Sequence, residues 1–188
     1  MIKKHTLKDS PVYIREFTED DITDRYLDWF QDSEVTRFLI SKNLDRQEVI
    51  DHLRYGQKTK EYFMYAIVLQ ATDQHIGNIK LGPIDRENGV SDLSTIIGET
   101  SCWGKGLASA AIKIANSLAF DVHGIRKLSA KIRGDNLGSL KAYTGGDWVI
   151  EGHLVDHILI EGQPKDAIVV SCFNTKRQNG NSTVYSEE

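Results

Sequence analysis

The stretch that decides the fold is residues 92–120, which read DLSTIIGETSCWGKGLASAAIKIANSLAF. Its second half repeats apolar residues at spacings of three and four, which is typical of one buried helix face. These residues are Leu107, Ala108, Ala111, Ile112, Ala115, Leu118 and Ala119. The spacing predicts a helix that starts near Gly106, preceded by a strand over Asp92–Gly98 and a turn at Trp103–Gly106. Two glycines in that turn allow several N–H groups at the helix start to face one anion, so a phosphate site is expected there.

Two well-known phosphate-binding motifs do not fit this turn. A P-loop requires serine or threonine after its lysine, but Gly106 follows Lys105, and Glu99 occupies the position of the first glycine. A dinucleotide-binding fingerprint requires a third glycine or alanine where this chain has Ser109. The glycines alone therefore leave a second interpretation open, a strand-to-helix connection in which they serve only steric needs.

Three separated motifs carry a family resemblance. They are Ile97-Gly98-Glu99, the segment Trp103–Ala108, and a downstream set of Asn136, Ser139 and Tyr143. Across roughly residues 11–174, the chain resembles the GNAT superfamily of N-acetyltransferases, in particular its RimJ/RimL-like branch. The acetyl-CoA signature of that family, Gln/Arg-x-x-Gly-x-Gly/Ala, is matched at Gly104 and Gly106, whereas Ser101 replaces the usual Gln or Arg.

Length and composition are typical of a single globular domain. The chain has 188 residues, 40% hydrophobic and 27% charged, so one domain over residues 1–174 is expected. Residues 175–188 are polar and lack periodicity, which predicts a loose tail. The formal net charge of −4 gives no basic field, so neither nucleic acid nor an anionic membrane is an expected partner. The sequence leaves a homodimer open.

Cysteines and apolar segments indicate the compartment. Cys102 and Cys172 are the only cysteines, and both are interpreted as reduced thiols, with Cys102 incidental to the chemistry. No apolar run approaches the ~20 residues of a membrane span, and no apolar core of a signal peptide follows the N-terminus. A cytoplasmic protein is expected.

Upstream of residues 92–120, the patterns predict a strand and two helices. Val12–Phe17 alternates weakly, which suits a first strand. Thr18 and Asp21 form a capping-box pattern, so a helix is expected to follow directly. Its apolar stripe consists of Ile22, Tyr26, Trp29 and Phe30. A second helix is predicted to open at Asp45.

Further strands complete a sheet. Two apolar runs predict a buried hairpin, and later alternating segments predict strands on either side of a short helix. In chain order these are strands at 63–69 and 76–81, a strand at 128–132, a helix at 136–143, and strands at 148–159 and 167–173. Strands before and after a crossover helix predict an α/β fold of the α+β type, a central mixed sheet flanked by helices. The resemblance implies the same architecture, the GNAT acyl-CoA N-acyltransferase fold.

The resemblance implies acetyl-CoA as the acetyl donor, with no metal. In the family, the strand before the glycine turn binds the pantetheine arm, the turn binds the pyrophosphate, and a downstream asparagine holds the arm. Carried onto this chain, these roles fall on Ile96, Ile97 and Gly98, on Trp103, Gly104, Lys105, Gly106, Leu107 and Ala108, and on Asn136 with Ser139 as a weaker candidate. Lys105 has a second interpretation as an exposed lysine without a role, because backbone groups carry the contact in such loops.

The resemblance also assigns the chemistry of transfer to Tyr143 and Glu99. A matching tyrosine protonates the departing thiolate in relatives, and a phenol with a pKa of about 10 keeps its proton at neutral pH. Packing on the sheet is the other interpretation of Tyr143. Glu99 closes the cofactor strand and is the best available base, directly or through water, although its place near the helix start also suits a structural role. Some relatives carry a carboxylate where this chain has Lys131.

The expected acceptor is a primary amine of a protein N-terminus, an amino sugar or a polyamine. Its pocket is assigned by fold position to Tyr26, Trp29, Phe30 and Arg37 on one side and to His153 and His157 on the other. In a regular strand the two histidines would lie about 13 Å apart, so no zinc site is expected.

One further departure from the family lies after Tyr143. Asp147 occupies a position where relatives carry glycine, and Gly145 and Gly146 are expected to absorb the turn instead. Together with Ser101 and Lys131, this departure leaves open a catalytically silent acyl-CoA-binding or interaction module with the same fold. Retention of the candidate catalytic residues favours the enzyme.

Overall fold

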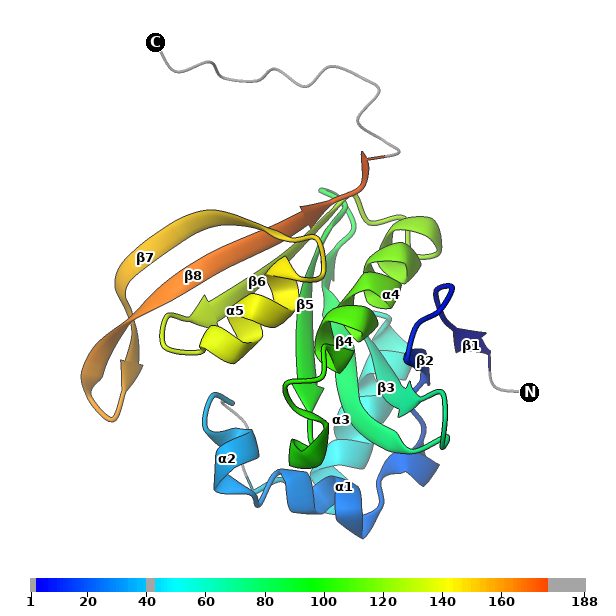
Figure 1. The fold of residues 1–188 in the computed structure, drawn as a ribbon. Coiled ribbons are helices and arrows are strands. Elements are labelled where there is room, and N and C mark those ends of the chain that lie inside the picture. Colours follow the sequence, from blue (N-terminus) through cyan, green and yellow to red (C-terminus); the bar gives the residue numbers. More distant parts are fainter. Residues whose placement is uncertain (1–2, 40–42, 176–188) are drawn as a thin grey trace.

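A central mixed β-sheet organises the structure (Figure 1). The computed structural model describes residues 3–39 and 43–175, and within them the strands pair in the order β1-β2-β3-β4-β5-β6-β8-β7. The strands are β1 (Lys4–His5), β2 (Val12–Glu16), β3 (Phe63–Leu69), β4 (His75–Asp85), β5 (Val90–Ile97), β6 (Lys127–Arg133), β7 (Val149–Ile160) and β8 (Gln163–Phe173). All neighbours run antiparallel except β5 and β6, which run parallel. The predicted mixed sheet is confirmed. The expected tail, apart from Thr175, lies outside the described residues.

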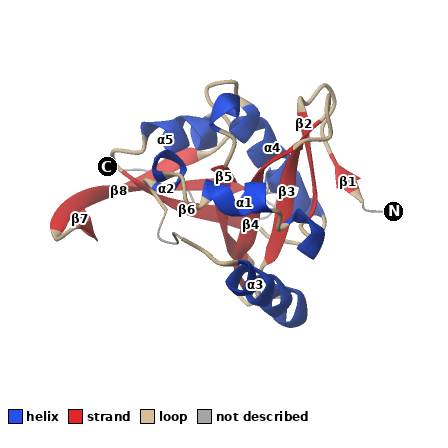
Figure 2. Ribbon diagram, turned by 90° about the horizontal axis from the view of Figure 1, so that it is seen from below, coloured by secondary structure: helices blue, strands red, loops and turns tan. Residues whose placement is uncertain are grey.

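Helices cover both faces of the sheet. They are η1 (Glu19–Asp21), α1 (Asp24–Trp29), α2 (Ser33–Thr36), α3 (Arg46–Thr59), η2 (Thr100–Cys102), α4 (Leu107–Asp121) and α5 (Leu137–Thr144). Figure 2 shows α4 and α5 on one side of the sheet and α3 on the other. In Figure 1, α1 and α2 lie across the lower end of the molecule, below the ends of the central strands. Within the described residues, no helix is long and apolar enough to cross a membrane.

Alternating side chains of the strands build two cores, one beneath each helical layer. In β3, Tyr65 and Ile67 join the core beneath α4, whereas Ala66 and Val68 join the core beneath α3. This strand is therefore buried on both faces, which explains its unbroken apolar run. The α4-side core also contains most of the predicted apolar face of α4, but Ala108, which was predicted for the same face, is only partly buried.

The start of the first helix differs from the prediction. Asp21 does accept a hydrogen bond from the Thr18 N–H at 2.8 Å, but only the single turn η1 follows. The chain then leaves helical geometry at Ile22, which has φ −81° and ψ 64° and is fully buried in the α3-side core. The helix α1 begins behind its own N-cap, Thr23. The prediction of one continuous helix directly after Thr18 was therefore wrong beyond the single turn η1. Neither α2 nor β1 was predicted.

Strands β5 and β6 diverge soon after they meet. Their pairing includes only Val90 with Lys127, Ser91 with Leu128, and Asp92 with Ser129. Beyond the last pair, β5 continues to Ile97 and β6 to Arg133. Within the described part of the chain, residues 93–97 of β5 therefore pair with no strand on this side. We call the region between them and residues 130–133 of β6 the β5–β6 gap.

Candidate functional site

Tyr143 reaches from α5 to the start of the β5–β6 gap. Its hydroxyl donates a hydrogen bond to the Leu93 carbonyl at 2.7 Å, and the residue is 4% exposed. Leu93 is the first β5 residue beyond the last pair with β6, so the phenol takes the place of a strand partner. Burial raises the pKa of Tyr143, which keeps its proton in place at neutral pH. The arrangement positions a proton donor at the gap.

The aromatic ring of Tyr143 is held by a second layer of contacts. Trp148 packs edge-on against it, with ring centroids 4.7 Å apart. The Trp148 indole N–H donates to Asn116 Oδ1 at 3.0 Å, and Asn116 Nδ2 donates to the Gly146 carbonyl at 2.9 Å. Asn116 was not singled out from the sequence. A polar residue on the apolar face of a predicted helix does indicate a buried hydrogen-bonding role, and Asn116 is buried.

The turn after α5 corrects one expectation. Asp147 itself has φ 69°, the left-handed conformation, whereas Gly145 has φ −67°. It was therefore wrong that Gly145 and Gly146 absorb the turn. These glycines allow close packing against α4 instead, because a Cβ on them would lie 2.9 Å from Ser109 Oγ and 2.6 Å from Ile112 Cγ2, respectively.

Thr95 adds an unsatisfied polar group to the gap. Its Oγ1 atom is buried and has no hydrogen-bond partner within the described residues. An interaction between the Thr95 and Tyr143 hydroxyls lowers the pKa of Tyr143, an effect smaller than the rise that burial causes. Thr95 therefore lies beside the phenol, although its Oγ1 makes no hydrogen bond of good geometry. A buried hydroxyl without a partner costs about 1–3 kcal/mol, so one that persists calls for a functional explanation. Thr95 was missed because burial and hydrogen bonding are tertiary properties.

The turn before α4 is open toward an anion. Gly104 and Gly106 both have φ 72°, and a Cβ on either would meet nothing within 4 Å. Gly106 is the N-cap of α4 but has no side chain to cap it, and the first turn holds no acidic residue. The N–H groups of Leu107 and Ala108 can therefore bind an external phosphate. These features fit the pyrophosphate of the expected cofactor.

Trp103 joins this turn to the end of β5. Its indole N–H donates to the Ile97 carbonyl at 2.8 Å. The Leu93 carbonyl faces the gap, whereas the Gly98 N–H bonds to Ile76 of β4. The period of two along the strand therefore turns the backbone groups of Ile97 toward the gap and those of Ile96 toward β4. An extended arm could form strand-like hydrogen bonds with this edge, as the family resemblance implies for pantetheine.

Gly98 provides space for an aromatic ring. A Cβ on Gly98 would lie 1.9 Å from Cδ2 of Trp29, which comes from α1. The Gly98 N–H donates to the Ile76 carbonyl at 2.9 Å, so the backbone is fixed beneath the ring. Trp29 therefore rests directly on the end of the expected cofactor strand, next to Glu99.

Glu99 belongs to a hydrogen-bonded set that reaches α1. Its Oε1 accepts from Arg25 Nε at 2.7 Å and from Trp29 Nε1 at 2.9 Å. Both bonds end on the same oxygen, which leaves Oε2 as the atom that could accept a proton. Arg25 was not singled out from the sequence, because only tertiary packing brings α1 to the end of β5.

Tyr26 and Phe30 are buried, as is Trp29, which is 5% exposed. Tyr26 and Phe30 are 3% and 8% exposed and belong to the α3-side core. His75 packs edge-on against Trp29, with ring centroids 5.0 Å apart, and its Nε2 donates to the Gly77 carbonyl at 2.9 Å. Tyr26 packs edge-on against both Trp29 and Phe30. Contact of Tyr26 and Phe30 with an acceptor stays a prediction.

The asparagine and serine of α5 share one cap. Asn136 is the N-cap, and its Oδ1 accepts from the Ser139 N–H at 3.1 Å. This bond leaves Nδ2 of Asn136 and the hydroxyl of Ser139 as the groups that could reach a cofactor. Lys105 is exposed in its turn, so its contribution to phosphate binding stays a prediction.

The two candidate histidines have different partners. His153 Nε2 lies 2.6 Å from Asp166 Oδ2, whereas His157 Nε2 accepts from Lys131 Nζ at 2.9 Å. The register of β7 shifts between Leu154 and Ile158, so the regular strand assumed for the spacing of the histidines does not exist there. Only His157 is thereby linked to a residue of the gap. Among the described residues, no group of three or more metal-ligating side chains forms.

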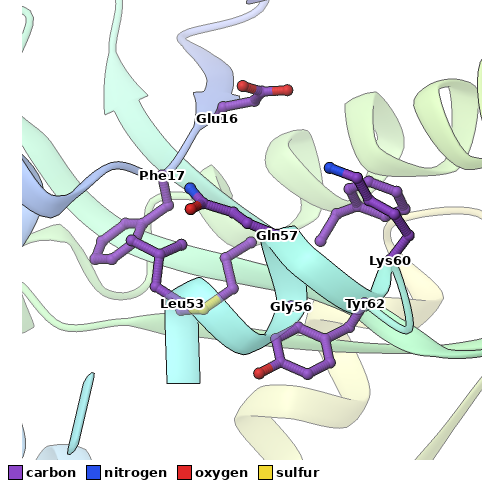
Figure 3. A pocket seen from close by; sticks show the side chains of 9 residues that line it. Glu16, Phe17, Leu53, Gly56, Gln57, Lys60 and Tyr62 are labelled. Carbon is purple, nitrogen blue, oxygen red and sulfur yellow. The ribbon is translucent and has the colours of Figure 1, made fainter. Parts of the chain in front are cut away.

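Arg37 lies on the α2 side of the gap. Its backbone carbonyl accepts from Arg133 Nη1 at 3.2 Å, which ties the end of α2 to the end of β6. Arg37 is thus brought next to the gap, whereas the cavity in Figure 3 lies elsewhere. That cavity, about 80 Å³, is lined by residues of β2, α3 and β3 and by their flanks, including Leu53, Gln57 and Lys60. It contains no candidate site residue and is far smaller than typical ligand pockets.

Comparisons with known proteins agree with this geometry. Residues 12–145 match the family model described as acetyltransferase (GNAT) domain. The chain is 26% identical over 172 residues to the uncharacterized N-acetyltransferase p20 of Bacillus licheniformis, and this alignment covers 90% of each chain.

Two solved structures share the fold at low sequence identity. Spermidine N-acetyltransferase from Vibrio cholerae, in complex with CoA and spermine, has a TM-score of 0.77 at 17% identity, covering 87% of this chain and 95% of the other. RimJ from Mycobacterium smegmatis, in complex with CoA-disulfide, has a TM-score of 0.78 at 14% identity, covering 94% of this chain and 88% of the other.

Proposed function

Because this chain belongs to the acetyltransferase (GNAT) family, we propose that it transfers an acetyl group from acetyl-CoA to a primary amine by direct attack on the thioester. The resemblance seen in the sequence is confirmed at the level of the family and of N-acetyltransferase activity. The observation that carries the proposal is the β5–β6 gap, which has the Tyr143 hydroxyl at one end and the open glycine turn at the other. A cytoplasmic location stays a prediction.

Acetyl-CoA would be held by backbone groups more than by side chains. The first-turn N–H groups of α4 and the turn at residues 103–106 would bind its pyrophosphate, helped by the helix dipole. The unpaired edge of β5 would bind the pantetheine arm. Bound there, acetyl-CoA supplies an activated acyl carbon for the amine to attack. The buried Thr95 hydroxyl is the side-chain group placed to contact it.

Tyr143 would act as the general acid. Its hydroxyl carries a proton at neutral pH and already makes a hydrogen bond within the gap. When the thiolate departs, the phenol donates that proton to the sulfur, and the Leu93 carbonyl loses its hydrogen bond. The buried ring, held by Trp148, keeps the hydroxyl in position through this step.

Glu99 would accept a proton from the acceptor ammonium, directly or through one water. The bonds from Arg25 and Trp29 orient its carboxylate and leave Oε2 for this purpose. The ring of Trp29 would form one wall beside the amine.

The proposal is tested by following CoA thiol release from acetyl-CoA with a panel of primary amines. The panel contains peptides with free N-termini, amino sugars and polyamines. Release that requires both the enzyme and one amine, with the acetylated amine identified by mass, supports the proposal. Binding of acetyl-CoA without release in every case would favour a silent acyl-CoA-binding module.

A further inference from the structure

Two cations of β6 border the gap on the face away from α4. Ala130 and Ile132 point into the α4-side core, so the period of two along the strand turns Lys131 and Arg133 to the opposite face. Both cations lie beyond Ser129, the last β6 residue that pairs with β5. Helices α1 and α2 contribute to the core on this same side, so the cations face the region assigned to the acceptor.

A third cation comes from α2. The first turn of this short helix contains the acidic Glu34, and its C-cap is Arg37. The guanidinium groups of Arg37 and Arg133 lie 5.2 Å and 4.5 Å from the centre of the Phe38 ring. The two arginines therefore converge on one aromatic ring at the end of β6.

Carboxylates do not compensate all of these cations. Arg133 forms a two-pronged ion pair with Asp135, with both distances 2.7 Å. Neither Arg37 nor Lys131 forms an ion pair within the described residues. Lys131 instead donates to His157 Nε2, an acceptor that is neutral in this role. The charge of Arg37 acts on Asp135 and that of Lys131 acts on Asp92, but neither cation has a carboxylate within ion-pair distance among the described residues.

Two carboxylates near the gap, Glu99 and Asp92, interact with cations. Glu99 is bound by Arg25 at 2.7 Å. Burial raises the pKa of Asp92, and the charges of Lys80 and Lys131 act against that rise. A polyamine, which carries positive charge along its whole length, would therefore meet the charges of Arg37, Lys131 and Arg133 on this face.

Building on the proposed function, we propose that the acceptor is a small primary amine that also carries a phosphate or carboxylate group. Arg37 and Lys131 bind the anionic group, while the amine lies against Trp29 and Glu99. An anion at this position pairs directly with both cations, and an arginine with a lysine suits either a phosphate or a carboxylate. The acceptor class thus differs from that of the spermidine N-acetyltransferase whose fold the chain shares.

The experiment compares acceptors that differ only in the anionic group. Steady-state thiol release is measured for phosphoethanolamine against ethanolamine, for β-alanine against propylamine, and for spermidine. Wild type is expected to prefer at least one anionic amine over its neutral counterpart by about tenfold or more in kcat/KM, the effect of one charge-assisted hydrogen bond. The pair that shows the preference identifies the anionic group as phosphate or carboxylate.

Two variants assign the preference to the residues. Arg37→Gln and Lys131→Met are each expected to raise KM for the anionic amine by about tenfold and to raise KM for its neutral counterpart by much less. Lys58→Met, which removes an exposed lysine from the last turn of α3, is the matched control and should change neither. Affinity for acetyl-CoA, measured by calorimetry, should be the same in all four proteins and shows that each is folded.

Several results would overturn the inference while leaving the proposed function intact. They are a preference for spermidine, equal rates for the anionic and neutral amines, or equal effects of the variants on both. Failure of every amine to release thiol would instead remove the proposed function and this inference with it.

Discussion

The hydroxyl of Tyr143 meets the carbonyl of Leu93 at 2.7 Å, one residue beyond the point where β5 stops pairing with β6. Without this contact, the Leu93 carbonyl would be a buried acceptor that the neighbouring strand no longer serves. The same phenol is the strongest candidate for the proton donor in the transfer. The hydroxyl of Tyr143 therefore has a structural role, as the donor to Leu93, and a proposed catalytic role. Variants of the surrounding residues should separate effects on stability from effects on activity.

The glycine turn is tested by adding a side chain where the phosphate would lie. Gly106→Asn is expected to weaken acetyl-CoA binding by about tenfold, or 1.4 kcal/mol, because the new side chain occupies the open space before α4. Asparagine tolerates the left-handed conformation of this position, φ 72°, so the fold should persist. Isothermal titration calorimetry measures the affinity.

Gly162→Asn is the control for that substitution. Gly162 has φ 75°, is equally open, and lies in the turn between β7 and β8. Its replacement should leave acetyl-CoA binding unchanged. Equal affinities for the two variants would show that the turn at residues 103–106 does not bind the cofactor.

The contact between Gly98 and Trp29 should dominate the stability of this end of β5. Gly98→Ala places a methyl group 1.9 Å from the indole, so we expect the free energy of unfolding to fall by about 1–3 kcal/mol. Gly152→Ala, where a Cβ meets nothing within 4 Å, should cost less than about 0.5 kcal/mol. Urea unfolding followed by tryptophan fluorescence compares the two. Similar losses would mean that Trp29 is not packed on Gly98 in solution.

Thr95 should show a conflict between stability and function. Thr95→Val removes a buried hydroxyl that has no partner, so unfolding should become harder by about 1 kcal/mol, while acetyl-CoA binding or turnover declines. Thr95→Ser keeps the hydroxyl and should retain binding and turnover close to wild type. A valine variant that is less stable, or one that is as active as wild type, would contradict this assignment.

The backbone of Asp147 predicts an order of stabilities. Because this residue has φ 69°, glycine should be favoured over aspartate, and aspartate over alanine, with steps of roughly 0.5–1 kcal/mol. The ion pair with Lys113 is exposed and adds little. Thermal unfolding of Asp147→Gly and Asp147→Ala measures the order. An alanine variant as stable as the glycine variant would show that the left-handed turn is absent.

The elements that are set by local pattern could be predicted from the sequence. The apolar spacing at residues 107–119 determined α4 and its buried face, and the glycine pair determined the turn before it. The break at Ile22 could not be predicted in this way, because burial of that side chain outweighed the capping signal at Thr18.

Several residues of the candidate site could be predicted from the sequence, but the contacts between them could not. Glu99 and Trp29 were both singled out, yet nothing local indicates that Trp29 and Arg25, 70 and 74 positions away, both donate to the Glu99 carboxylate. Asp147 was judged by its residue type, which disfavours φ above zero, although aspartate is among the residues that adopt such angles. Partners distant in the chain decide these features, so single-sequence patterns do not contain them.

The measurement that tests the account most directly is the single-turnover rate of thiol release by Tyr143→Phe, alongside its affinity for acetyl-CoA. The substitution keeps the buried ring against Trp148 and removes only the hydroxyl. We predict a rate about 10²-fold lower, the lower end of general acid catalysis because a CoA thiolate is a tolerable leaving group, with affinity within about twofold of wild type. An unchanged rate, or a loss of affinity as large as the loss of rate, would contradict the role of Tyr143 as proton donor.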